Sequence, residues 1–163
     1  EDDADDVDEG GWNNEWDWDS GASPCRYFGV KCDLRELHVM ELDLSSNGLR
    51  SPVGGRIPYE ISALGRLMLL ELDGNELRGP LPVEAMVKMP NLTTATFKMN
   101  LLTGTVPVSL VDTNLAFLSL DENKLQGSVP TEVCNKTWEG SINTVVVNCR
   151  VNKCQCCRGP FCE

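Results

Sequence analysis

Cysteine side chains carry the most distinctive chemistry in this 163-residue sequence. Six of the eight cysteines lie in the C-terminal segment 134–163: Cys134, Cys149, Cys154, Cys156, Cys157 and Cys162. A bond between the adjacent Cys156 and Cys157 would be strained, so we expect each of them to pair elsewhere. The crowding predicts a compact disulfide-bonded cap, whose pairing the sequence leaves open. The run Cys-Gln-Cys-Cys at 154–157 keeps a zinc or redox site as the alternative.

The other residue types do not indicate catalysis. His38 is the single histidine, and no partners are arranged around it for nucleophilic catalysis. The sequence contains no glycine loop of the kind that cradles phosphate. We therefore predict a chain that is not an enzyme and that uses no cofactor and no metal. Asp6, Asp8 and Asp17 resemble a calcium loop only faintly, which leaves nonspecific cation binding by this acidic end as the alternative.

Acidic residues are concentrated at the N-terminus. Residues 1–19 hold ten of the 25 acids and none of the 14 Lys and Arg residues, so the net charge of −11 comes mainly from this end. The sequence has no basic stripe that would attract nucleic acid. It also has no apolar run of the roughly 20 residues needed to span a bilayer. We predict a protein that neither binds nucleic acid nor inserts into a membrane.

A repeated pattern, LxxLxLxxNxLxGxxP, organises the middle of the chain. Its copies occupy 39–58, 67–82, 92–107 and 115–130. The first copy carries an insertion after Leu49, and the third has Ala95 and Phe97 in two of the leucine places. A degenerate fifth copy begins near Ile142. Repeats of this length predict a solenoid of stacked coils.

The spacing of the pattern explains how one unit folds. The Leu-x-Leu core is a short strand with both leucines on one face, because side chains alternate along a strand. One unit cannot bury that face alone, so several coils must stack and both ends must be capped. The asparagine can bond backbone groups of its own coil and the adjacent coil. Short helical turns are predicted at Pro58–Gly65, Pro82–Met89 and Pro107–Val111.

With these repeats, the chain resembles the plant-type, extracellular leucine-rich repeat proteins over about residues 12–150. Its cysteine-dense end is also similar to secreted leucine-rich repeat proteins of diatoms and related algae. The resemblance implies an α/β repeat solenoid, a short array with a parallel concave sheet and disulfide-bonded N- and C-terminal caps. The segment CRYFGVKC is similar to the CxWxGVxC cap motif of the family, with Tyr27 in the tryptophan place. Its six-residue gap supports a disulfide between Cys25 and Cys32.

We divide the chain into an acidic arm (1–9), an N-terminal cap (10–38), four repeats (39–133) and a cysteine-rich C-terminal cap (134–163). The last part includes the degenerate fifth repeat, with Val145 and Val147 pointing inward. The cysteine content predicts a mature secreted chain whose leader has been removed. Asn91 and Asn135 begin N-glycosylation triplets, and we favour Asn135 because it lies in the less regular cap.

Outward strand positions predict the binding surface. The resemblance implies that the concave face binds a protein, peptide or glycan. The candidate contact residues are Glu41, Asp43, Met68, Glu71, Asp73, Thr96, Lys98, Met99, Phe117, Ser119, Asp121 and Glu122. Methionines and an aromatic ring on a solvent face suit an adaptable contact surface.

We predict from this a secreted, non-enzymatic protein that acts by recognition. The alternative is a structural subunit that self-assembles into an extracellular filament or matrix. Its acidic arm would then dock on the mildly basic C-terminal cap of the next subunit, as a homo-oligomer. The inhibition of wall-degrading glycosidases, known for related plant proteins, is a third function that no residue selects.

Overall fold

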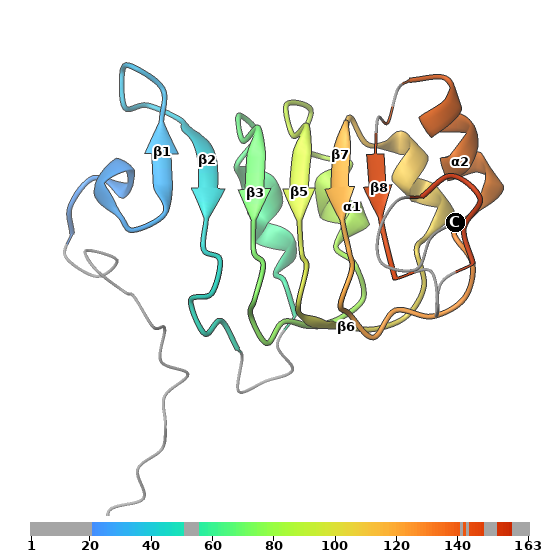
Figure 1. Cartoon of the computed structure of the whole chain (residues 1–163). Helices are drawn as coiled ribbons and strands as arrows, with labels where there is room; N and C mark the ends of the chain where they lie inside the picture. Colours follow the sequence, from blue (N-terminus) through green and yellow to red (C-terminus); the bar gives the residue numbers. More distant parts are fainter. Residues whose placement is uncertain (1–20, 51–55, 141, 143, 149–152, 158–163) are drawn as a thin grey trace, which may run out of the picture.

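The computed structural model describes residues 21–50, 56–140, 142, 144–148 and 153–157. Its main feature is a sheet of six strands in the order β1-β2-β3-β5-β7-β8 (Figure 1). The strands are β1 (Val30–Cys32), β2 (Val39–Asp43), β3 (Leu69–Glu71), β5 (Thr94–Thr96), β7 (Phe117–Ser119) and β8 (Thr144–Val146). Strand β1 is antiparallel to β2, and the later neighbours are all parallel. The predicted parallel sheet is therefore confirmed, with one antiparallel strand added at its N-terminal edge.

Short helical segments cover one face of this sheet (Figure 1). They are η2 (Tyr59–Ala63), α1 (Val83–Met86), η3 (Val108–Asp112) and α2 (Thr131–Trp138). Each begins directly after a proline, whose fixed φ and missing N–H suit the start of a helix. A second, two-stranded sheet pairs β4 (Arg78–Gly79) with β6 (Leu101–Leu102), and η1 (Pro24–Arg26) precedes β1. The three helical turns expected from the sequence are confirmed.

The core lies between the sheet and these helical segments. Leu70, Ala95, Leu118 and Val145 are register partners on successive strands, and all four are fully buried. Phe97, in a leucine place of the pattern, is also fully buried. Each coil therefore buries its inner side chains only because the next coil covers them.

Asparagines of the pattern bridge neighbouring coils. The Asn75 Oδ1 accepts hydrogen bonds from the backbone N–H groups of Asn47 (3.1 Å) and Leu49 (2.9 Å). The Asn75 Nδ2 donates to the carbonyls of Leu44 (2.9 Å) and Leu72 (3.0 Å). Asn100 and Asn123 repeat this arrangement one and two coils later. These amides satisfy backbone groups at the turn after each strand that would otherwise be buried without partners.

Helix α2 joins the fourth coil to the C-terminal cap. It runs across position 133/134, where the sequence placed the end of the repeats, and it carries Cys134 on its buried side. Val145 and Val147 of the fifth coil are fully buried, as the pattern predicted. The acidic arm, the first part of the N-terminal cap, Cys149 and Cys162 lie outside the described residues.

Gly29 packs closely against the backbone of the first coil. Its φ is +75°, and a Cβ at this position would lie 1.9 Å from the carbonyl oxygen of Asp43. The Gly29 carbonyl in turn accepts a hydrogen bond from the Asp43 N–H at 2.8 Å. Any side chain at this position must therefore push β2 away from the cap.

We expect Gly29→Ala to lower the free energy of unfolding by at least roughly 2 kcal/mol, because it adds a backbone clash to left-handed strain. Urea unfolding followed by circular dichroism measures this loss. Gly104→Ala is the matched control, because Gly104 has φ +88° but no atom within 4 Å of a built Cβ. The control is expected to lose only about 1 kcal/mol. Equal losses in the two variants would contradict the clash.

Candidate functional site

The outward side of the six-stranded sheet, which faces away from the helical segments, is called the concave face here. Strand register arranges its side chains in rows that cross the strands. One row contains Glu41, Leu69, Thr94, Phe117 and Thr144, and the next contains Asp43, Glu71, Thr96, Ser119 and Val146. Because neighbouring strands lie about 4.8 Å apart, each row is a nearly continuous ladder of side chains.

Three residues predicted for this face are buried rather than open to a ligand. Thr96 and Ser119 are each 7% exposed and Asp121 is 4% exposed. Ser119 and Thr96 lie between side chains of two adjacent coils, and the Ser119 hydroxyl donates to the Asp121 Oδ1 at 2.7 Å. Packing along a row, which the pattern of one coil does not show, therefore covers these three residues, and their part in binding stays a prediction.

Apolar side chains remain exposed elsewhere on the face. Met68 is 45% exposed, Met99 53% and Phe117 36%. Met99 has φ +53°, and the equivalent residues Ser46, Gly74 and Glu122 are also left-handed. Since four coils share this conformation, it belongs to the repeat fold and does not by itself indicate a site. Exposed apolar side chains also occur on the helical segments, at Tyr59, Val108 and Trp138, so a contact surface on this face stays a prediction.

Basic residues on the face are engaged by acids. The Lys98 Nζ lies 3.3 Å from a carboxylate oxygen of Asp121 and 3.3 Å from one of Glu122. The Lys31 Nζ lies 2.6 Å from the Glu41 Oε2. The sequence prediction missed Lys31 because it stopped the sheet at β2. The alternation of Val30, Lys31 and Cys32 was the signal available for one more strand.

Three carboxylates remain without a cation. Within the described part of the chain, no basic side chain forms an ion pair with Asp43, Glu71 or Asp73. Burial raises the pKa of the Glu71 carboxyl, and the nearby charges of Asp43 and Asp73 raise it further. Burial likewise raises the pKa of Asp73, although the N–H of Lys98 donates to its Oδ1 at 2.7 Å. The negative charge here is therefore unfavourable in the folded protein.

We expect Glu71→Gln to raise the melting temperature at pH 7. The folded protein holds the Glu71 proton more tightly than the unfolded chain does. The stability of the unmodified protein therefore falls as pH rises from the ordinary range of a glutamate through its raised folded-state pKa. Thermal unfolding between about pH 3 and pH 7 tests this, with the gain disappearing at the acidic end, where the side chain is neutral in both states.

Glu132→Gln is the control for that series, because Glu132 is an exposed acid in the first turn of α2. It is expected to leave the melting temperature nearly unchanged at both ends of the pH range. A loss of stability for Glu71→Gln at pH 7, or a gain that persists at about pH 3, would contradict the unfavourable charge.

Six described cysteines form three disulfides. Cys25 is bonded to Cys32, which agrees with the cap motif. Cys134 is bonded to Cys156 and Cys154 to Cys157, so the two adjacent cysteines pair elsewhere, as expected. The bond from Cys134 to Cys156 attaches the C-terminal segment to helix α2.

The zinc alternative for 154–157 does not fit these bonds. The sulfur atoms of Cys134, Cys154 and Cys156 all lie within 4.8 Å of one another, as three metal ligands would. Each of them is bonded to another sulfur, however, and a metal needs the free thiolate. In the described residues, this cluster is therefore a disulfide cap.

The two glycosylation candidates differ in their surroundings. Asn91 is half-buried, and its Nδ2 donates to the carbonyl of Gly65 at 2.7 Å. Asn135 is exposed on helix α2. A glycan on Asn91 would cost the hydrogen bond that links two coils, whereas one on Asn135 would project into solvent.

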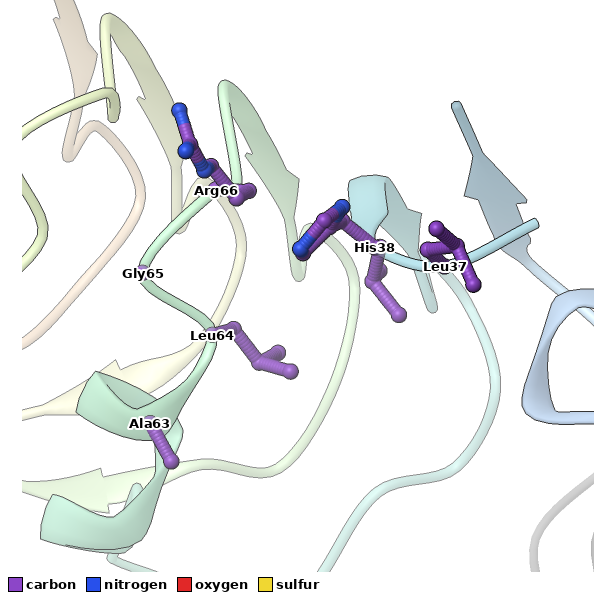
Figure 2. Close-up of a pocket in the computed structure, with 7 residues that line it drawn as sticks. Leu37, His38, Ala63, Leu64, Gly65 and Arg66 are labelled. Carbon is purple, nitrogen blue, oxygen red and sulfur yellow. The ribbon is translucent and has the colours of Figure 1, made fainter. Parts of the chain in front are cut away.

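A hollow of about 440 Å³ lies at the edge of the first two coils (Figure 2). It is lined by Leu37, His38, Val39, Ala63, Leu64, Gly65 and Arg66. None of these seven side chains is a hydroxyl, thiol or carboxyl group. The His38 Nδ1 lies 2.8 Å from the Asp33 Oδ2. The N–H of Leu37 donates to the Asp33 Oδ1, and these two contacts together lower the pKa of Asp33. The half-exposed His38 therefore secures the loop before β2 through its contact with Asp33.

No protein-family model matches the chain. Curated plant receptors do match it: the leucine-rich repeat receptor-like serine/threonine-protein kinase GSO2 of Arabidopsis thaliana is 35% identical over 95 residues, which is 58% of this chain and 7% of that protein. The chain spans only 6% to 11% of the length of such curated relatives. The matched part of the kinases is their leucine-rich repeat region. The similarity to diatom and algal proteins stays a prediction.

Solved structures give the same comparison in three dimensions. The BIR2 ectodomain of Arabidopsis thaliana is 27% identical with a TM-score of 0.68, over 86% of this chain and 70% of that one. The ectodomain of the Arabidopsis receptor kinase HAESA, in complex with an IDA peptide hormone ligand, is 29% identical with a TM-score of 0.65, over 83% of this chain and 21% of that one. No helix in the described residues is long and apolar enough to cross a membrane. The chain has the leucine-rich repeat fold of plant receptor ectodomains.

Proposed function

We propose that this chain is a secreted, non-enzymatic recognition module that binds a protein or peptide on its concave face. One observation carries the proposal: helical segments cover one side of the sheet, while the other side exposes Met68, Met99 and Phe117 between charged residues. Apolar side chains interspersed with charged ones on a face that no other element covers suit a contact surface for a partner. A glycan remains a second ligand class for the same face.

Other observations support this proposal. The HAESA ectodomain, which has the same fold, is known in complex with a peptide hormone ligand. Three disulfides among the described residues favour an oxidising, extracellular compartment. Asn135 is the proposed glycan attachment site, since its side chain is exposed.

Selection from a displayed random-peptide library tests the proposal. Clones selected on the unmodified protein are expected to lose binding, by at least about tenfold in Kd, to a Met68→Glu/Phe117→Glu variant, because central apolar contacts carry most binding energy. The matched control is Tyr59→Glu/Val108→Glu, which changes two exposed apolar residues of η2 and η3. Clones that lose binding equally to both variants, or to neither, would contradict recognition by the concave face.

Self-assembly is the second candidate function, and the charge distribution of the sequence favours it. Residues 1–19 are strongly acidic. Residues 134–163 are mildly basic, because they carry Lys136, Arg150, Lys153 and Arg158 but only two acids, Glu139 and Glu163. An acidic arm that docks on the far end of the next copy makes a contact that can propagate.

Light scattering on the full chain and on a chain lacking residues 1–19 tests this second function. An assembling subunit is expected to form large particles at low salt that dissociate on truncation or in about 0.5 M salt, because exposed charges are screened. A full chain that is monomeric under all these conditions would exclude assembly through the arm.

A further inference from the structure

We infer that the concave face selects a ligand with a cationic side chain, an extended segment of a partner protein that places a lysine or arginine over Asp43, Glu71 and Asp73. These three carboxylates are called the acidic ladder here. The inference rests on the proposed function of the face and names the chemistry of its partner.

The first argument is the unbalanced charge of the acidic ladder. Asp43 and Glu71 are register partners on β2 and β3, and Asp73 follows two residues later, so all three project from one side of the sheet. The two basic residues nearest to them, Lys31 and Lys98, are already paired with other acids. Within the described residues, the ladder is therefore left with charge that a partner can complement.

The second argument is a hydroxyl without a partner. Thr96 is 93% buried, since its exposed fraction is 7%, and its Oγ1 makes no hydrogen bond in the described structure. The residue is the register partner of Glu71, and its hydroxyl lies close enough to Asp73 to lower the pKa of that carboxyl, although the contact does not reach the geometry of a full hydrogen bond. A buried hydroxyl without a partner costs free energy. Because this hydroxyl is not open to a ligand, a bound cation would satisfy it through Asp73, by drawing that carboxylate into hydrogen-bond geometry with the Thr96 hydroxyl.

The spread of the carboxylates favours a side chain over a metal ion. Among the described residues, the one group of three or more ligand atoms within 4.8 Å is the disulfide cluster of the C-terminal cap. The ladder carboxylates thus do not converge as the ligands of a single ion must. Separated acids suit the planar guanidinium of arginine, which offers several donors in different directions.

The neighbouring row adds an apolar contact. Leu69 lies two residues before Glu71 on β3, and the exposed Met68 precedes it. An extended ligand that crosses the strands can therefore place a cationic residue over the ladder and an apolar residue over Leu69 and Met68. The raised pKa values of Glu71 and Asp73 arise mainly from burial, with repulsion from neighbouring carboxylates added, and a bound cation would relieve that repulsion.

The test compares two synthetic peptides by NMR titration of the ¹⁵N-labelled full chain at low salt. One is the capped pentapeptide Leu-Gly-Arg-Gly-Leu, and the other replaces the arginine by citrulline, which has nearly the same shape without the charge. The arginine peptide is expected to bind with a Kd at least about tenfold lower, as close charge pairs at interfaces do. Its shift changes are expected on β2, β3 and β5, centred on the ladder and Thr96.

Two variants complete the design. Glu71→Gln/Asp73→Asn is expected to lose the tenfold preference while staying folded, which thermal unfolding checks. Glu84→Gln/Glu132→Gln removes two exposed acids from helices α1 and α2 on the other side of the sheet, and it is expected to keep the preference. The two variants have the same net charge, so a difference between them cannot come from charge alone.

Each contrary result has one meaning. Equal binding of both peptides on the concave face would overturn the cation inference and leave the proposed function standing. Three other results would also overturn the cation inference. They are no binding of either peptide at about 5 mM, shift changes on the helical side of the sheet, and displacement of the peptide by micromolar calcium chloride. The proposed function fails on a separate result, in which library clones bind the Met68→Glu/Phe117→Glu variant as tightly as the unmodified protein.

Discussion

The fold depends on satisfying backbone groups at the point where each coil turns inward. A strand of three residues cannot continue its ladder into the turn, and the groups that follow it are buried by the next coil. Asn75, Asn100 and Asn123 solve this with side-chain amides that bond two coils at once. Because each amide serves its own coil and the preceding one, coils are stable only as a stack.

This requirement leaves the two sides of the sheet with different tasks. Leucines, Ala95 and Phe97 on the inner side form the core that holds the coils together. The outer side does not contribute to that core, so charged residues can occupy it. Glu71 and Asp73 show the consequence, since burial raises the pKa of both carboxyls, with repulsion from Asp43 and Asp73 added at Glu71 and from Asp121 at Asp73. A surface that weakens the fold in this way is typical of a site kept for binding rather than stability.

The caps close an array that would otherwise expose its core at both ends. Strand β1 covers the first coil with an antiparallel edge, held by the close approach of Gly29 to Asp43. At the other end, helix α2 and the disulfide from Cys134 to Cys156 attach the last segment directly to the fourth coil. Helix α2 therefore spans the predicted boundary at 133/134 and connects the last repeat to the cap.

The sequence alone determined the repeat, its inner leucines, the helical turns and the bond between Cys25 and Cys32. All of these depend on local spacing: period-two alternation, a proline before each turn and a fixed gap between cysteines. It also determined that Cys156 and Cys157 pair elsewhere, because adjacency restricts geometry. The partners themselves, Cys134 and Cys154, depended on how the last segment folds back.

Tertiary structure decided which outward residues reach solvent. Thr96, Ser119 and Asp121 occupy outward positions yet are buried, because coils about 4.8 Å apart pack their side chains against each other along a row. It also decided which charges are paired, since Lys31 reaches Glu41 only through the antiparallel β1. Exposure and pairing are properties of neighbouring coils, and the pattern of one coil does not contain them.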